Sequence, residues 1–161
     1  MLYSYFKLRQ YYKKHDKSDL PFVPSRKERI KAMIELSGVQ PGEKSLDLGA
    51  GDGRIVIAFA QKGASASGVE IDNILFDIAN HNVRKKRLEK KARIIKGDFW
   101  QEDFGKYDII TIWGLRRIMG RLEDKLQKEA KPGCRILCNY FDLPTWPPAA
   151  EKENVFLYIK K

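Results

Sequence analysis

Residues 44–54 of this chain read KSLDLGAGDGR, and no other segment says more about its architecture. The apolar beginning predicts a short buried strand at 45–48, and the glycines predict a tight turn that leads into a helix at 53–62. Glycine has no Cβ and adopts positive φ readily, so a ligand can approach such a turn closely. The first N–H groups of the following helix then face that ligand. We therefore expect a nucleotide-like cofactor at this turn.

The spacing of the glycines selects among cofactors. The dinucleotide fingerprint needs three glycines as G-x-G-x-x-G, whereas here Gly49 and Gly51 are followed by Arg54. The turn is also acidic, because Asp47 precedes it and Asp52 lies inside it. These carboxylates repel a pyrophosphate and attract an ammonium or sulfonium cation. No G-x-x-x-x-G-K-[ST] sequence occurs, which excludes a P-loop. A cofactor with an amino-acid end fits this turn best.

Two further acids follow predicted strands. Glu70 ends a predicted strand at 65–70 and lies 21 residues after the first glycine of the turn. The paired oxygens of its carboxylate suit two vicinal ribose hydroxyls. Asp98 and Phe99 follow a predicted strand at 92–96, where an acid and an aromatic ring suit the amino group and the face of an adenine. Successive strand ends thus match successive parts of one nucleoside cofactor.

These segments together resemble a known family. DLGAGDGR at 47–54, GVEID at 68–72 and GDFW at 97–100 look like motifs I, II and III of the class I S-adenosylmethionine-dependent methyltransferases. The resemblance spans residues 44 to about 140. It implies an α/β fold with a doubly wound, Rossmann-like, mostly parallel sheet, S-adenosyl-L-methionine as cofactor and S-adenosyl-L-homocysteine as product. The cofactor-binding residues that it implies are Asp47, Gly49, Gly51, Asp52, Gly53, Glu70, Ile71, Asp98 and Phe99.

A narrower resemblance covers residues 21–161. PFVPS at 21–25, the extended motif I and FDLPTWPP at 141–148 are similar to a small family of protein-lysine N-methyltransferases. That family includes archaeal enzymes and mitochondrial enzymes that act on the ATP synthase c-subunit and on adenine nucleotide translocase. Many members carry an N-terminal membrane segment. The resemblance implies that the first of these segments closes over the methionine end of the cofactor through Phe22, Val23, Pro24 and Ser25.

The acceptor side of the site follows a predicted strand at 107–112. Enzymes that methylate adenine N6 or a glutamine amide usually carry an Asn/Asp-Pro-Pro-aromatic motif there, and this chain has Trp113 and Gly114 instead. Trp113 suits an aromatic wall for a cationic or planar acceptor, and a core tryptophan is the alternative. We name Trp113, Asn139 and Asp142 as candidate catalytic residues.

Arginines open the next predicted helix, at 115–129. Arg116, Arg117 and Arg121 lie on the predicted cofactor side, where cations oppose the helix dipole by roughly 0.3–1 kcal/mol each. A locally unfavourable choice of residue suggests contact with an acidic substrate, and simple solvent exposure is the alternative. The basic run at 84–96 lies at the opposite edge of the predicted sheet, which favours a solvated surface.

The remaining pattern completes a single methyltransferase domain at 21–161, preceded by a basic, aromatic segment at 1–20. We expect Ser25 and Glu28 to cap a helix that ends near Leu36. A proline-rich link at 143–154 predicts a trimmed C-terminal part that lacks the usual last helix and one strand. The other predicted elements are a helix at 73–88 and strands at 134–141 and 154–160.

The net charge and the cysteines indicate what kind of partner and compartment to expect. The chain has 161 residues and a net charge of +10, which favours an acidic partner. Its cysteines, Cys134 and Cys138, lie four apart on a predicted strand, roughly 13 Å between Cα atoms, which is too far for a disulfide. We expect a reducing, cytoplasmic location, structural thiols, no metal site and a monomer. The basic, aromatic N-terminus suits an anionic membrane surface or RNA, and a terminal helix that packs its rings on the domain is the alternative.

Three functions stay open at this point. A protein-lysine N-methyltransferase acting on a lysine-bearing protein is the leading interpretation. An RNA or small-molecule methyltransferase is the second, because of the net charge and the arginines. A non-catalytic cofactor-binding module is the third.

Overall fold

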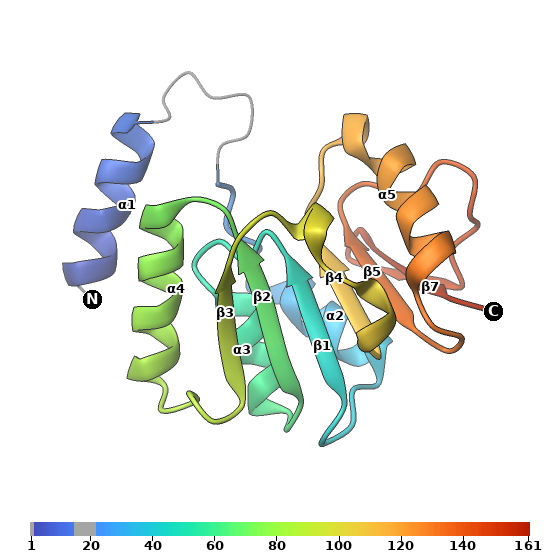
Figure 1. Cartoon of the computed structure of the whole chain (residues 1–161), viewed down its shortest axis with the longest axis horizontal. Helices are drawn as coiled ribbons and strands as arrows, with labels where there is room; N and C mark the ends of the chain where they lie inside the picture. Colours follow the sequence, from blue (N-terminus) through green and yellow to red (C-terminus); the bar gives the residue numbers. More distant parts are fainter. Residues whose placement is uncertain (1, 15–21) are drawn as a thin grey trace.

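The computed structural model describes residues 2–14 and 22–161. Seven strands form one sheet in the order β3-β2-β1-β4-β5-β7-β6 (Figure 1). Strands β1 to β5 pair in parallel, whereas β7 is antiparallel to both β5 and β6. The α/β, mostly parallel sheet expected from the sequence is confirmed. The strands are Lys44–Leu48 (β1), Ser65–Glu70 (β2), Ala92–Lys96 (β3), Ile109–Ile112 (β4), Arg135–Asn139 (β5), Ala150–Lys152 (β6) and Val155–Ile159 (β7).

Helices cover both faces of this sheet. Alternate residues of a strand point to opposite faces, so Ile109 packs into one core cluster and Ile110 into the other. Helices α2, α3 and α4 bury their apolar stripes in the first cluster, and α5 buries its stripe in the second. The helices are Leu2–Lys14 (α1), Lys27–Ser37 (α2), Arg54–Gln61 (α3), Asn73–Lys85 (α4) and Arg116–Glu129 (α5), with short 3₁₀ turns at Phe99–Gln101 (η1) and Phe104–Lys106 (η2).

The strand order positions the site. β1 pairs with β2 on one side and with β4 on the other, because the chain runs outward from β1 through β2 to β3 and then crosses back to place β4 on the other side of β1. Open parallel sheets bind ligands at such a switch point, outside the carboxyl ends of the strands. Asp47, Glu70, Ile112 and Asn139 occupy the carboxyl ends of β1, β2, β4 and β5. The topology therefore brings residues that are far apart in sequence to one edge of the sheet.

The C-terminal part differs from the prediction. The link at 143–154 contains the short strand β6, which pairs antiparallel with β7 and forms one edge of the sheet. Every residue of β6 is exposed, so its sequence has no alternation of apolar and polar residues from which a strand could be predicted. The predicted absence of a strand is therefore wrong. The expected shortening holds for the helix, because residues 140–149 form none.

The predicted cap of α2 is also wrong. The N-cap residue is Arg26, no side chain caps this helix, and Glu28 has no capping partner. The Ser25 hydroxyl instead accepts a hydrogen bond from Asn139 Nδ2 at 2.9 Å. A contact between residues so distant in sequence overrides the local capping pattern. Further along the chain, α4 stops at Lys85 rather than 88, because Arg87 adopts a φ of 55°.

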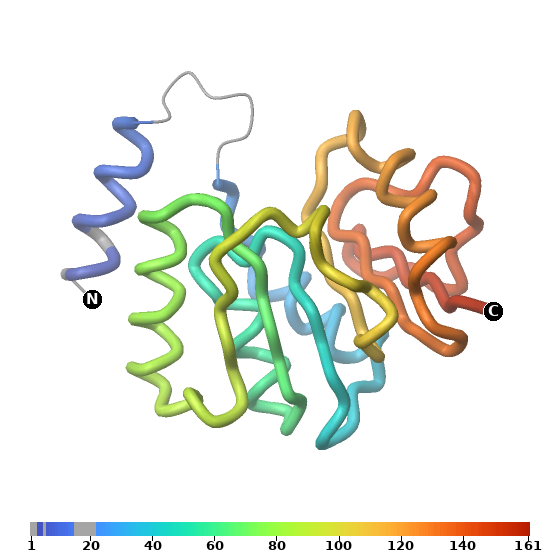
Figure 2. Tube along the Cα trace, in the orientation of Figure 1, coloured from blue at the N-terminus to red at the C-terminus, as the bar shows by residue number. Residues whose placement is uncertain are grey.

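Helix α1 packs beside α4 at the β3 end of the sheet, far from the C-terminus (Figure 2). Ser4 Oγ donates to Asn82 Oδ1 at 3.2 Å, Lys7 forms an ion pair with Asp77 at 3.3 Å, and Tyr11 is buried. The predicted boundary between residues 20 and 21 lies outside the described residues. Within the described ranges, no helix has the length and apolar character needed to span a membrane.

Candidate active site

A cavity of about 620 Å³ opens at the carboxyl edge of the sheet, beside the glycine turn. This volume lies within the usual range for small-molecule sites. Its walls come from α1, the segment at 22–25, the turn after β1, the end of β2, η1 and the loop between β4 and α5. Predicted site residues that line it are Phe22, Val23, Ser25, Asp47, Gly49, Gly51, Asp52, Glu70, Ile71, Phe99 and Trp113.

Backbone contacts hold the glycine turn open toward this cavity. The N–H groups of Gly49 and Ala50 both donate to the carbonyl oxygen of Val69, at 3.0 and 2.8 Å. Gly49 and Gly51 have φ values of 80° and 57°, which favour glycine. A Cβ on Gly51 would lie 2.4 Å from the ring of Phe22. The turn therefore needs glycine at residue 51 for conformation and for space.

Glu70 joins the turn to the end of β2. Gly51 N–H donates to Glu70 Oε2 and Asp72 N–H donates to Glu70 Oε1, each at 2.8 Å. Burial raises the pKa of Glu70, and these backbone hydrogen bonds oppose that rise. Each carboxylate oxygen has a further lone pair. The residue is therefore fixed in place and can still accept from ligand hydroxyls, as predicted for a ribose.

Asp47 is the most deeply buried acid of the site, 3% exposed. Thr111 Oγ1 donates to Asp47 Oδ1 at 2.7 Å from the neighbouring strand β4. Desolvation raises the pKa of Asp47 to about 7, and the nearby Glu70 and Asp52 carboxylates add to the rise. A cationic group bound beside Asp47 would relieve this excess of negative charge. The surroundings thus fit the ammonium group of an amino-acid end.

Arg54 occupies the position where the dinucleotide fingerprint has its third glycine. Its Nε and Nη2 atoms contact the two carboxylate oxygens of Asp52 at 2.9 and 2.6 Å. Its Nη1 atom donates to the carbonyl oxygen of Ser25 at 2.9 Å. Hydrogen bonding to Asp52 raises the pKa of Arg54. Asp52 is therefore paired within the protein, and Arg54 ties the turn to the segment that covers it, a role missed in the sequence.

Helix α1 also supports the covering segment, Phe22–Ser25. Phe22 N–H donates to Tyr11 Oη at 2.9 Å, and Tyr12 Oη donates to the Phe22 carbonyl oxygen at 3.0 Å. Tyr11 lines the cavity as well. The packing of this helix on the domain is one of the two alternatives for residues 1–20, but no pattern in the sequence assigns either tyrosine to the site. The only available signal was the short separation between these tyrosines and Phe22.

The three candidate catalytic residues lie in different surroundings. Trp113 is half-buried and lines the cavity, whereas Asn139 and Asp142 do not. Asn139 is 1% exposed, and its Oδ1 accepts from Arg29 Nη1 at 3.4 Å while its Nδ2 donates to Ser25. Asp142 is exposed. The catalytic roles of all three stay predictions.

Three residues predicted to bind cofactor also lie outside the cavity lining. They are Pro24, Gly53 and Asp98. A Cβ on Gly53 would lie 3.1 Å from Ala79 Cβ, so Gly53 permits the close approach of α3 and α4. Asp98 Oδ1 accepts from Trp100 N–H at 3.0 Å and begins η1. Their contacts with cofactor stay predictions.

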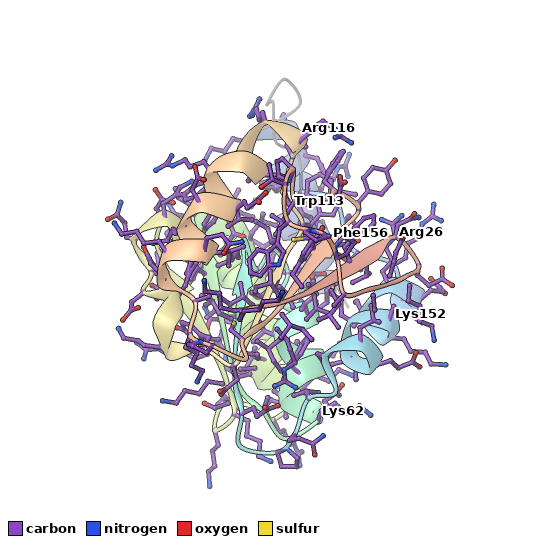
Figure 3. All side chains as sticks on the ribbon, turned by 90° about the vertical axis from the view of Figure 1, so that its right-hand side faces the viewer. Arg26, Lys62, Trp113, Arg116, Lys152 and Phe156 are labelled. Carbon is purple, nitrogen blue, oxygen red and sulfur yellow. The ribbon has the colours of Figure 1, made fainter. Side chains whose placement is uncertain are left out.

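A cluster of aromatic and arginine side chains follows the carboxyl end of β5. The Arg29 guanidinium lies 5.0 Å from the centre of the Tyr140 ring, and the Arg116 guanidinium lies 5.5 Å from that of Phe141. The rings of Tyr140 and Phe141 meet edge to face at 4.9 Å. Figure 3 shows Trp113 and Arg116 at the end of the molecule opposite to Lys62. The sheet edge that carries the cavity thus also carries this cluster.

In the described part of the chain, we find neither a reactive thiol nor a metal site besides the cavity. Cys134 and Cys138 are buried and unpaired, and burial raises the pKa of each, to about 12 for Cys134. Both therefore stay protonated at neutral pH. Among the described residues, no group of three His, Cys, Asp or Glu side chains could hold a metal ion.

Comparison with known proteins identifies the family. A model of the ANTKMT methyltransferase domain matches residues 47–150. This chain belongs to that family. The match covers the glycine turn, Glu70 and the acceptor loop after β4, which form much of the cavity wall. The protein is an S-adenosylmethionine-dependent methyltransferase, as the three motifs predicted.

Relatives of this chain have related names. The chain is 34% identical over 131 residues to a protein-lysine N-methyltransferase of Saccharolobus islandicus, covering 80% of this chain and 81% of that protein. It is 33% identical over 129 residues to the human lysine N-methyltransferase of the ATP synthase c-subunit, covering 80% of this chain and 55% of that protein. The chain thus spans most of the archaeal relative but about half of the human one.

Solved structures share the fold of this chain. An RNA methyltransferase of Salinibacter ruber in complex with S-adenosyl-L-homocysteine is 30% identical, with a TM-score of 0.79 over 86% of this chain and 92% of that chain. A methyltransferase of Thiobacillus denitrificans, also with S-adenosyl-L-homocysteine, is 20% identical with a TM-score of 0.65 over 86% of this chain and 59% of that chain, and shows the fold alone. The buried acid at the glycine turn and the fixed Glu70 carboxylate fit this cofactor.

Proposed function

We propose that this protein is a protein-lysine N-methyltransferase. The observation that carries the proposal is the cavity itself, whose acidic end lies at Asp47 and whose acceptor side is bounded by Trp113. The names of the archaeal and human relatives support a lysine acceptor. The contribution of this chain is to place a lysine side chain against the indole and to align it with the bound cofactor.

The chemistry makes defined demands on the protein. S-adenosylmethionine supplies an already activated methyl group, so catalysis rests mainly on alignment of the acceptor. The acceptor lysine must be neutral, because an ammonium has no lone pair. An apolar wall such as Trp113 favours the neutral amine by desolvation, which lowers a lysine pKa. The aromatic face also attracts the lysine cation before it loses its proton.

The loop after β4 lacks a motif that is typical of nucleobase or amide acceptors, and it holds Trp113 in a fixed position. Residues 111–115 read TIWGL and contain no Asn/Asp-Pro-Pro-aromatic motif, which enzymes acting on planar amino groups usually carry. Gly114 is buried, and a Cβ there would lie 2.8 Å from the sulfur of Met119. The loop is therefore tightly packed against α5, which fixes the position of the neighbouring indole.

RNA methylation is the second candidate, and one specific observation favours it. The Salinibacter ruber structure with the high TM-score is described as an RNA methyltransferase. If the acceptor is RNA, the affinity of the protein for RNA should fall steeply as the salt concentration rises, because phosphate contacts release counterions. The first experiment therefore has to separate protein from RNA acceptors.

The test is transfer of labelled methyl from S-adenosylmethionine into a cell extract, divided between protease and ribonuclease. We expect protease alone to remove the label, and acid hydrolysis to release methyl-lysine. Label that is sensitive only to ribonuclease would contradict the proposal. Trp113→Ala should reduce transfer while S-adenosyl-L-homocysteine still binds. Trp146→Phe is the matched control, because Trp146 packs against Tyr158 with ring centres 5.8 Å apart, away from the cavity.

A further inference from the structure

Four arginines lie in the cavity lining or close, in the chain or in space, to residues that line it. We call them the arginine collar, and they are Arg29, Arg116, Arg117 and Arg121. Arg117 lines the cavity, and Arg29 is hydrogen-bonded to Asn139, which in turn bonds the cavity residue Ser25. The other two members, Arg116 and Arg121, follow on the outer surface of α5. Charges on α2 and α5 thus lie near the acceptor side of the cavity, and Arg117 is the member that lines it.

Aromatic rings fix three of these guanidinium groups. Arg29 and Arg116 lie over the two ends of the Tyr140–Phe141 pair, at 5.0 and 5.5 Å from the ring centres. Arg121 lies 4.0 Å from the centre of the Trp100 ring. A guanidinium over an aromatic face keeps its N–H groups directed outward around its plane. The collar is therefore oriented before any partner binds.

The loop that carries the aromatic pair is itself held firmly. Leu143 N–H donates to Tyr158 Oη at 2.9 Å, and Thr145 N–H donates to the buried Glu123 at 3.0 Å. Tyr140 adopts a φ of 80° and exposes 51% of its surface. A bulky residue in this conformation is strained, and such strain collects at functional sites. Tyr140 keeps this position because of the contacts on either side of it.

The collar lacks internal counter-charges. Arg54, Arg135 and many lysines form ion pairs, but none of the four collar arginines pairs with a carboxylate anywhere in residues 2–14 and 22–161. Arg116 and Arg117 also lie in the first turn of α5, where the helix dipole opposes positive charge. The collar is therefore a concentration of positive charge near the acceptor side of the cavity.

A lysine-bearing substrate would be repelled by this charge unless it carried acids of its own. We propose that the arginine collar binds acidic side chains that flank the acceptor lysine of a protein substrate. This inference rests on the proposed function, since it concerns the substrate of the same site. Paired carboxylate oxygens match the guanidinium fork, and they neutralise the collar so that the lysine can enter.

The distribution of charge favours a short acidic segment over a nucleic acid. A polynucleotide needs a basic track that follows successive phosphates. The longest basic run of this chain, at 84–96, begins in the last turn of α4 and includes β3, the edge strand at the other end of the sheet from β5. Its residues 84–91 lie at the amino edge of the sheet, and only the end of β3 reaches the carboxyl edge. The collar is thus compact, and it is not continuous with that run.

The test uses the full chain saturated with S-adenosyl-L-homocysteine and fluorescent eleven-residue peptides with one central lysine. Two aspartates flank the lysine in one peptide, and two asparagines replace them in the other. We expect the acidic peptide to bind on the order of tenfold more tightly at low salt, and Arg116→Glu with Arg117→Glu to abolish the preference. Arg84→Glu with Lys85→Glu changes the net charge equally at the other edge and should leave the preference intact.

Other outcomes would overturn the inference. Equal affinity for both peptides, or an equal loss in both paired variants, would show that the collar does not select acids. Tighter binding of a twelve-nucleotide RNA would assign the collar to nucleic acid. If the variant with Arg116→Glu and Arg117→Glu fails to fold, as judged by S-adenosyl-L-homocysteine binding, the variant with Arg116→Gln and Arg117→Gln takes its place. Absence of methyl-lysine in the transfer assay would instead contradict the proposed function, whatever the peptides show.

Discussion

The amide of Asn139 donates to the hydroxyl of Ser25 at 2.9 Å and so joins the end of β5 to the segment that covers the cavity. Both side chains are buried. Because Arg29 donates to the other end of the same amide, Asn139 links three parts of the chain. We infer from this geometry that Asn139 positions the covering segment, and its catalytic role stays a prediction.

Asn139→Ala should therefore weaken cofactor binding. The change leaves the Ser25 hydroxyl without its donor, and losing a buried hydrogen-bond partner costs about 1–3 kcal/mol. We expect calorimetry to give a raised Kd for S-adenosyl-L-homocysteine together with lower stability. Asn80→Ala is the matched control, since Asn80 Nδ2 bonds only the Phe76 carbonyl oxygen of its own helix. An unchanged Kd with slower methyl transfer would instead support the catalytic role.

Steric contact between Gly51 and Phe22 gives a second prediction. Gly51→Ala combines a positive φ, which costs an ordinary residue about 1–2 kcal/mol, with overpacking of about 1–3 kcal/mol against the Phe22 ring. Gly49→Ala has the positive φ but no atom within 4 Å of its new Cβ. Urea unfolding should show that Gly51→Ala is the more damaging. Adding Phe22→Ala should restore part of the stability that Gly51→Ala loses, but none of the stability that Gly49→Ala loses. Restored stability in the Gly49→Ala background would contradict this account.

The sequence predicted those parts of the molecule that depend on local pattern. Buried strands such as β4, which reads IITI, have nearly continuous apolar runs, and the glycine turn has a recognisable spacing. The strand ends then follow from topology, which is why Asp47 and Glu70 could be placed at the cavity in advance.

Contacts between distant segments could not be predicted in this way. Ser25 has the local pattern of a helix cap, yet its hydroxyl is used by Asn139, 114 residues further along. Tyr11 belongs to a helix whose composition suggests an external surface, but its hydroxyl accepts from Phe22 inside the site. Arg54 breaks a cofactor fingerprint, and only the structure shows that it pairs with Asp52. Each depends on packing that no short sequence window contains.

The buried thiols give a third prediction. Burial raises the pKa of Cys138, so the thiolate needed for nucleophilic attack is scarce at neutral pH. Cys138→Ala should keep methyl transfer close to the wild-type rate and lower stability by about 1 kcal/mol through lost packing. Iodoacetamide at pH 8 should label neither cysteine until the protein is denatured. A large loss of transfer in a folded Cys138→Ala variant would indicate a covalent mechanism through this residue.

The pKa of Asp47 gives a dependence of cofactor binding on pH. Burial raises this pKa to about 7, whereas an unfolded aspartate titrates near 3.9. The folded protein therefore holds a proton that the unfolded chain has released between about pH 4 and 7, and this group contributes less stability as the pH rises through that window.

The affinity for a cationic cofactor group should rise with pH, whereas the contribution of Asp47 to stability falls. Ionised Asp47 attracts the ammonium group of S-adenosyl-L-homocysteine, so the affinity should fall as the pH drops below about 7, by at most about tenfold per pH unit. Asp47→Asn keeps an acceptor for the Thr111 hydroxyl but has no charge, so its affinity should be lower and nearly independent of pH. Calorimetric titrations from pH 5.5 to 8.5 on both proteins make the comparison. Parallel curves for the two proteins would assign the titration to another group, with the raised pKa of Glu70 as the next candidate, and Glu70→Gln would then remove it.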